Sequence, residues 1–126
     1  MDIKLKLKEL LNNSYAVYSN YKVSCILETK DNNYFYGVNV ENASYGATIC
    51  AERNGYKKQD FKRIYIMNSS DKISSCCMLC RQVFLEFFDM DMEVIMYNNK
   101  FDEKKLTVKE MCPYPFSEDD LKWKVV

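Results

Sequence analysis

Two stretches decide the fold of this chain, Arg63–Met67 (RIYIM) and Cys77–Phe88 (CMLCRQVFLEFF). The first is a short run rich in β-branched and aromatic residues, and the polar triplet Asn68–Ser70 closes it, which is typical of a buried strand. The second carries its apolar residues at helical spacing. Glu93–Tyr97 (EVIMY) then repeats the strand pattern. Strands alternating with helices predict helices packed on a sheet.

The sequence upstream adds a helix and a hairpin. Apolar residues within Ile3–Leu11 fit part of a helical stripe. Tyr21–Leu27 and Tyr34–Val40 both have strand composition, and the turn-forming cluster Lys30–Asn33 between them predicts a hairpin. Thr48–Lys58 then predicts a helix with its first residue as the N-cap.

The sequence downstream predicts a short helix and a tail. Thr107-x-x-Glu110 is a capping box for a helix that Pro113 ends, and Ser117–Asp120 could start a last turn. The residue pattern gives the order helix, strand, strand, helix, strand, helix, strand. A hairpin followed by strand-helix alternation predicts a mixed sheet in one domain that spans residues 1–126.

The composition excludes several kinds of protein. A chain of 126 residues fits one domain, and 48% hydrophobic residues allow a globular core. Eighteen basic and eighteen acidic residues cancel, so no overall field attracts nucleic acid or anionic lipid. The absence of histidine excludes His-bearing metal sites and Ser-His-Asp triads. The sequence has no secretory signal and no apolar run of roughly 18 residues, so we expect a cytoplasmic protein without a membrane span.

The six cysteines indicate a metal site. In a reducing cytosol they are better interpreted as thiols or metal ligands than as disulfides. Cys77-x-x-Cys80 places two thiolates where one metal ion can take both, and zinc is the usual occupant of sulfur sites. Cys50 would be a third ligand and leave the fourth position open for water, as in catalytic zinc sites. Both cysteine motifs start predicted helices, where backbone N–H groups stabilise thiolate charge.

Glu52 is the natural proton carrier in a chain without histidine, because it follows Cys50 by two residues and is held close to the metal. Other interpretations remain open on the residues alone. The pair Cys77 and Cys80 also fits a structural zinc clip or a redox pair, and Cys50 also fits a small core residue. Spacing does not decide between a catalytic and a structural site.

Five linked motifs carry a more specific signal than the cysteine spacing. They are Tyr18–Val23 (YSNYKV), Asn39–Gly46 (NVENASYG), Cys50–Arg53 (CAER), Cys77–Val83 (CMLCRQV) and Pro113-x-x-Phe116. In order and spacing, over nearly its whole length, the chain resembles the small zinc-dependent cytidine deaminases. The resemblance implies an α/β fold, a three-layer helix-sheet-helix sandwich around a five-stranded mixed sheet. It also implies hydrolysis of cytidine or deoxycytidine to uridine or deoxyuridine and ammonia, in pyrimidine salvage.

The resemblance gives the residues of the two reaction motifs their roles. Cys50, Cys77 and Cys80 would bind one zinc ion per chain. Glu52 would take a proton from the zinc-bound water to N3 of the pyrimidine, and would next protonate the amino leaving group. Ala51 would offer backbone contacts to the base.

The same resemblance implies that Asn39 and Glu41 hydrogen-bond the 3′-hydroxyl of the sugar and that Tyr21 stacks near the base. A structural interpretation stands beside each role: Asn39 as a strand-end turn residue, Glu41 as a solvated charge and Tyr21 as a core tyrosine. Tyr21 occupies a position where the family usually has Phe, so its hydroxyl needs a partner or water if it is buried.

Further roles concern the assembly and the surroundings of the metal. Tyr45 and Phe116 match positions that close a neighbouring subunit's site in the tetrameric members, so a homotetramer is implied; either residue could instead belong to the core. Arg53 would donate to the zinc thiolates, or form a surface salt bridge. Arg81 and Gln82 match the motif without receiving a chemical step.

The chain departs from the family pattern at Val17, Ser24 and Cys76, where relatives commonly have Pro, Gly and Pro. Cys76 matters most, because a second thiol beside Cys77 permits another pairing with Cys80. A ligand at the helix entry gains from unpaired N–H groups, and the family register also points to Cys77. We therefore expect Cys77 rather than Cys76 to hold the metal.

Two other functions compete with nucleoside deamination. The first is deamination of another cytosine-containing compound, such as an antibiotic nucleoside or a polynucleotide. The Asn39–Asn42 motif (NVEN) favours a free sugar, and the zero net charge argues against a polynucleotide. The second is a non-catalytic zinc-stabilised binding module, which has no need of Glu52. The expected partner is therefore a small nucleoside, with neither nucleic acid nor membrane.

Overall fold

A computed structural model of the chain describes residues 1–41 and 61–116. Its elements, in chain order, are α1 (Ile3–Leu10), a 3-10 turn (Leu11–Asn13), β1 (Val23–Thr29), β2 (Tyr34–Val38), β3 (Phe61–Asn68), α3 (Met78–Phe87), β4 (Glu93–Tyr97), β5 (Glu103–Thr107) and α4 (Val108–Met111). The predicted first helix, hairpin, central strands, cysteine-bearing helix and capped short helix are thereby confirmed. The predicted helix Thr48–Lys58 and the last turn at Ser117–Asp120 lie outside the described residues.

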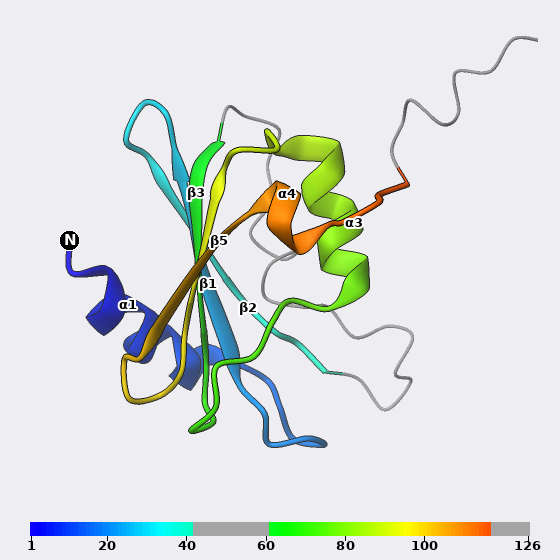
Figure 1. The fold of residues 1–126 in the computed structure, drawn as a ribbon. Helices are drawn as coiled ribbons and strands as arrows, with labels where there is room; N and C mark the ends of the chain where they lie inside the picture. Colours follow the sequence, from blue (N-terminus) through cyan, green and yellow to red (C-terminus); the bar gives the residue numbers. More distant parts are fainter. Residues whose placement is uncertain (42–60, 117–126) are drawn as a thin grey trace, which may run out of the picture.

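The five strands form one sheet in the order β2-β1-β3-β4-β5. β3 and β4 are parallel, and every other neighbouring pair is antiparallel. Figure 1 shows α1 on one face of the sheet and α3 with α4 on the other. The predicted three-layer sandwich around a five-stranded mixed sheet is confirmed.

Alternation along the strands builds two cores, because successive side chains of a strand point to opposite faces. Residues packed with α1 are Leu7, Leu10, Leu11, Ile26, Met67, Ile95 and Tyr97. The opposite core takes the intervening strand residues, such as Leu27, Ile66 and Val94, together with Phe84 of α3. In this opposite core the Phe84 ring is fully buried and stacks on Phe88 at 5.1 Å.

The residue pattern is wrong in giving four strands, because it misses β5. Glu103, Lys104 and Lys105 are consecutive charged residues, all exposed, so this strand shows no apolar alternation. Among the described residues, β5 lies at the edge of the sheet and pairs with β4 alone. Charged side chains on an edge strand discourage pairing with other chains. The same charges remove the alternating apolar pattern by which a strand is recognised in a sequence.

The helices of the described ranges are short. Within residues 1–41 and 61–116, none is both long and apolar enough to cross a membrane.

Candidate active site

The two sulfurs of the predicted pair lie together at the start of α3. Cys77 is the N-cap residue of α3, with φ −66° and ψ 162°, and Cys80 lies in the first turn. Their Sγ atoms are 3.2 Å apart, and the Cys80 N–H points at Cys77 Sγ with a separation of 3.4 Å. An extended N-cap residue turns its side chain toward the N–H groups of the first turn, which favour a negative charge there. The geometry therefore suits thiolates.

This pair fits a zinc ion. A tetrahedral zinc ion with Zn–S bonds of about 2.3 Å holds two thiolates about 3.8 Å apart, so this pair, at 3.2 Å, needs only a small separation of the sulfurs to accept one. Cys80 is fully buried, whereas Cys77 is exposed. The third predicted ligand, Cys50, lies outside the described residues, and within them no three His, Cys, Asp or Glu side chains are grouped to hold a metal. The role of Cys77 and Cys80 as ligands stays a prediction.

Cys76, the competing thiol, belongs to the core. Its side chain is 7% exposed and packs in the cluster beneath α3 that includes Phe84. Its carbonyl accepts a hydrogen bond from Arg81 Nε at 3.0 Å. The structure thus gives Cys76 the environment of a small apolar residue.

Asn39 follows β2 and joins three segments. Its Oδ1 accepts from the Val23 N–H at 3.0 Å and from the Ser14 hydroxyl, while Nδ2 donates to the Tyr21 carbonyl at 2.9 Å. Its side chain is buried. Asn39 therefore fixes the backbone beside Tyr21, and one Nδ2 proton remains beyond these contacts.

Glu41 is half-buried and accepts hydrogen bonds from Tyr18 and Ser19 of the loop before β1. Its Oε1 accepts from the N–H groups of Tyr18 at 3.1 Å and Ser19 at 3.0 Å, and its Oε2 accepts from the Ser19 hydroxyl. The Ser19 hydroxyl contributes most, ahead of the Ser19 and Tyr18 N–H groups, to lowering the Glu41 pKa, and desolvation opposes them. The carboxylate therefore stays ionised.

Tyr21 lies in the same group of contacts. Its N–H donates to the Ser19 hydroxyl oxygen at 3.0 Å, and that hydroxyl in turn donates to Glu41. Together with the Asn39 amide on its carbonyl, this contact places Tyr21 next to both predicted sugar-binding residues. The structure thus brings three of the predicted substrate residues into one group.

Phe116 lies beside the middle of α3. Its carbonyl accepts from Gln82 Nε2 at 2.8 Å, and its side chain is 57% exposed. Other predicted site residues lie outside the described ranges; they are Tyr45, Cys50, Ala51, Glu52 and Arg53.

The chain is similar to known proteins along most of its length. Residues 3–97 match the family described as the cytidine and deoxycytidylate deaminase zinc-binding region. The chain belongs to this deaminase family. It is 33% identical to the cytidine deaminase of Sporosarcina psychrophila, across 92% of this chain and 90% of that protein. It is 32% identical to the enzyme of Mycoplasma genitalium, across 90% and 92%. A crystal structure of cytidine deaminase from Burkholderia pseudomallei superposes with a TM-score of 0.84 at 33% identity, covering 90% of this chain and 96% of that one. The resemblance inferred from the motifs is confirmed.

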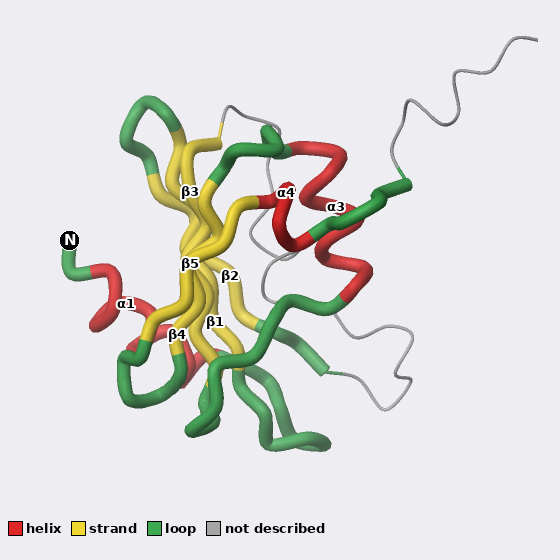
Figure 2. The backbone as a smooth tube through the Cα atoms, in the orientation of Figure 1, coloured by secondary structure: helices red, strands yellow, loops and turns green. Residues whose placement is uncertain are grey.

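Two asparagines of this deaminase-family chain were not recognised in the sequence as organising residues. Asn68 ends β3 and Asn98 follows β4; they are 4% and 2% exposed. Asn68 Oδ1 accepts from the N–H and hydroxyl of Ser70, and Asn98 Nδ2 donates to the Asp71 carbonyl at 2.8 Å. They hold together the loops at one end of the sheet (Figure 2), including the loop that leads to Cys77. The sequence signal for both asparagines is a polar residue where an apolar strand ends.

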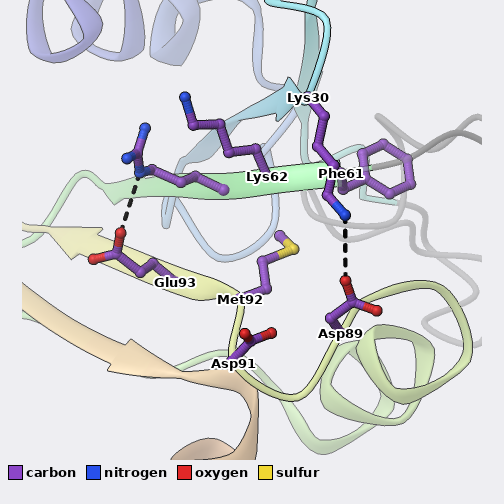
Figure 3. Close-up of a pocket in the computed structure, with 8 residues that line it drawn as sticks. Lys30, Phe61, Lys62, Asp89, Asp91, Met92 and Glu93 are labelled. Carbon is purple, nitrogen blue, oxygen red and sulfur yellow. Dashed lines mark hydrogen bonds and ion pairs between the residues drawn. The ribbon is translucent and has the colours of Figure 1, made fainter.

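A cavity of about 220 Å³ lies at the opposite end of the same strands, where β3 and β4 begin. Figure 3 shows Lys30 directed at Asp89 and charged residues on both strands. The ion pairs are Lys30 with Asp89 at 3.5 Å and Arg63 with Glu93 at 3.2 Å. The members of these pairs satisfy one another, and the cavity is separate from the deaminase-family motifs.

Proposed function

We propose that the chain is a zinc-dependent enzyme that hydrolyses cytidine or deoxycytidine to uridine or deoxyuridine and ammonia. The observation that carries this proposal is the pair of cysteine sulfurs 3.2 Å apart at the start of α3, in a chain of the deaminase family. Cys50 joins Cys77 and Cys80 in holding one zinc ion per chain. Residues 1–126 form a single cytidine deaminase-like domain.

Bound zinc supplies the Lewis acidity that activates water near neutral pH. The protein's own task is to place charge and move protons. The first-turn N–H of Cys80 stabilises the charge of the Cys77 thiolate. Glu52 delivers a proton to N3 of the pyrimidine and a second proton to the amino group at C4, so that oxygen replaces nitrogen at C4 and ammonia leaves. Ala51 contacts the base through its backbone, and Arg53 donates to the thiolates.

Recognition of the sugar uses the remaining hydrogen-bonding capacity of Asn39 and Glu41. A carboxylate has about four acceptor sites, and the described residues fill three on Glu41, which leaves one on Oε2. Asn39 Nδ2 donates one of its two protons to Tyr21. A hydroxyl group between them accepts from Asn39 and donates to Glu41. A sugar 3′-hydroxyl matches this donor-acceptor pair, and Tyr21 provides a ring for the base.

The proposal includes an assembly and a cellular role. The chain acts as a cytoplasmic homotetramer in pyrimidine salvage, with Tyr45 and Phe116 closing a neighbouring subunit's site. The side chain of Phe116 is exposed, so it is accessible to a neighbouring subunit. Its substrate is a small nucleoside rather than a nucleic acid.

The test follows the loss of cytidine absorbance with purified protein and counts zinc by metal analysis. Glu52→Gln keeps the side-chain shape and removes the proton carrier, so zinc should remain while turnover falls about 10²–10⁴-fold. Deoxycytidine and a cytidine analogue without the 3′-hydroxyl complete the substrate set. A zinc-loaded parent protein that leaves cytidine and deoxycytidine unchanged would refute the proposal and indicate a binding module instead.

A further inference from the structure

Arg81, the residue directly after Cys80, has a side chain with three partners. Its Nε donates to the Cys76 carbonyl at 3.0 Å, and Nη1 donates to the Met111 carbonyl at 2.9 Å. Nη2 bonds the Ser75 hydroxyl. A planar guanidinium presents donors in several fixed directions, which a lysine ammonium does not. One side chain thus joins the start of α3 to the segment before it and to the end of α4.

Two of the hydrogen bonds from Arg81 enclose Cys77. The side chain holds the carbonyl before Cys77, and the backbone N–H of Arg81 donates to the carbonyl of Cys77 itself at 3.1 Å. Because each peptide group is planar, hydrogen bonds to the carbonyls on both sides of a residue restrict its φ and ψ. Cys77 is thereby held at φ −66° and ψ 162°, the conformation that directs its sulfur toward Cys80.

The contacts beyond Cys77 make this arrangement rigid. Met111 is buried at the end of α4, so its carbonyl is a fixed anchor 30 residues further along the chain. The Cys112 thiol also donates to the carbonyl of Arg81 at 3.7 Å. Residues at the end of α4 therefore hold both the side chain and the backbone of Arg81 in place.

We infer that Arg81 is a positioning residue for the metal site, which holds Cys77 beside Cys80 in the geometry a metal ion needs. The inference rests on the proposed zinc site and adds a residue to it. Without Arg81 the peptide before Cys77 rotates more freely, and metal binding must then restore its order. Groups that orient metal ligands typically contribute about 10–100-fold in metal affinity. We expect Arg81→Lys to weaken metal binding by that factor.

A merely structural role predicts a different pattern, and Arg63 provides the matched control. Arg63 also bridges two groups, Glu28 at 3.1 Å and Glu93 at 3.2 Å, but at the far end of the sheet. Arg63→Lys likewise replaces a guanidinium, with its several N–H donors, by an ammonium group, and it leaves the cysteine pair unchanged. A loss of metal binding caused by general destabilisation would follow the fall in unfolding temperature in both variants.

The experiment measures cobalt and zinc affinity of the full chain by competition with a chromophoric chelator, well below the unfolding temperature of each metal-free variant. Cobalt also reports thiolate coordination through its charge-transfer absorption. Arg81→Lys should bind both metals about 10–100-fold more weakly and show altered cobalt absorption. Arg63→Lys should stay within about threefold of the parent protein. Arg81→Gln is the second variant, should Arg81→Lys not fold.

Three results would overturn the inference: unchanged affinity in Arg81→Lys, equal losses in the Arg63 and Arg81 variants, or failure of both Arg81 variants to fold while Arg63→Lys folds. The readout does not require turnover. Weakened metal binding in a parent protein without deaminase activity would therefore support the role of Arg81 and refute the proposed reaction separately.

Discussion

Cys76 and Cys77 are adjacent residues of one type, so replacing each by alanine gives a matched test of the metal ligand. Cys76→Ala removes a buried sulfur of roughly methylene size and should cost about 1 kcal/mol of stability. For a chain of 126 residues this lowers the melting temperature by about 4 °C. Zinc should stay at one ion per chain, because the Cys76 side chain packs in the core rather than at the helix entry.

Cys77→Ala should behave in the opposite way. It removes a weak N-cap acceptor of the Cys80 N–H, which costs the metal-free protein only about 0.5 kcal/mol or 2 °C. Metal affinity should fall by more than the roughly 100-fold that loss of an orienting group causes. Metal analysis after dialysis and calorimetry with chelator present measure the two effects separately. A metal-free Cys76→Ala beside a zinc-loaded Cys77→Ala would transfer the ligand role to Cys76 and refute this reasoning.

Two further predictions test the sugar-binding group and the core. Ser19→Ala should raise the Glu41 pKa, measured by NMR titration, because it removes the hydrogen bond that lowers this pKa most. In the parent protein this hydrogen bond stabilises the fold at pH values above the ordinary pKa of a glutamate. The stabilisation is lost as the pH falls through the lowered pKa of Glu41, so the variant and the parent should differ least in acid. An unchanged pKa would contradict the assignment. Phe84→Ala should lower the free energy of unfolding by about 3–5 kcal/mol, measured by calorimetry, because the buried Phe84 ring stacks on Phe88. Phe87→Ala is the control and should lower it far less, because Phe87 is 43% exposed. Equal losses would contradict this account of the core.

Elements with regular apolar patterns could be predicted from the sequence. The expected bounds of Glu93–Tyr97 are those of β4, and α3 begins and ends one residue inside the predicted Cys77–Phe88. β1 starts at Val23 rather than Tyr21, because the Tyr21 carbonyl is taken by Asn39 and not by a neighbouring strand. β5 could not be recognised, since its first three residues are charged.

In the candidate site, too, the contacts within one element could be predicted from the sequence, and the contacts between distant segments could not. The pairing of Cys77 with Cys80 is a property of one helical turn, so the spacing of three residues was sufficient to predict their proximity. The contact of Ser19 with Glu41 spans 22 residues, and that of Arg81 with Met111 spans 30. Such contacts depend on how loops from different elements meet, which residue spacing does not encode.

The parallel pairing of β3 and β4 places the cysteine pair proposed as metal ligands near one end of the sheet. The carboxyl ends of both strands lie at the same end of the sheet. There Asn68 and Asn98 bind the backbone of the loops that follow. The loop after β3 leads directly to the N-cap of α3, where N–H groups favour thiolate charge. At the opposite end, Arg63 and Glu93 neutralise one another. N–H donors at a helix start stabilise thiolate charge, and among the described residues the carboxyl end of β3 leads the chain into such a helix, α3.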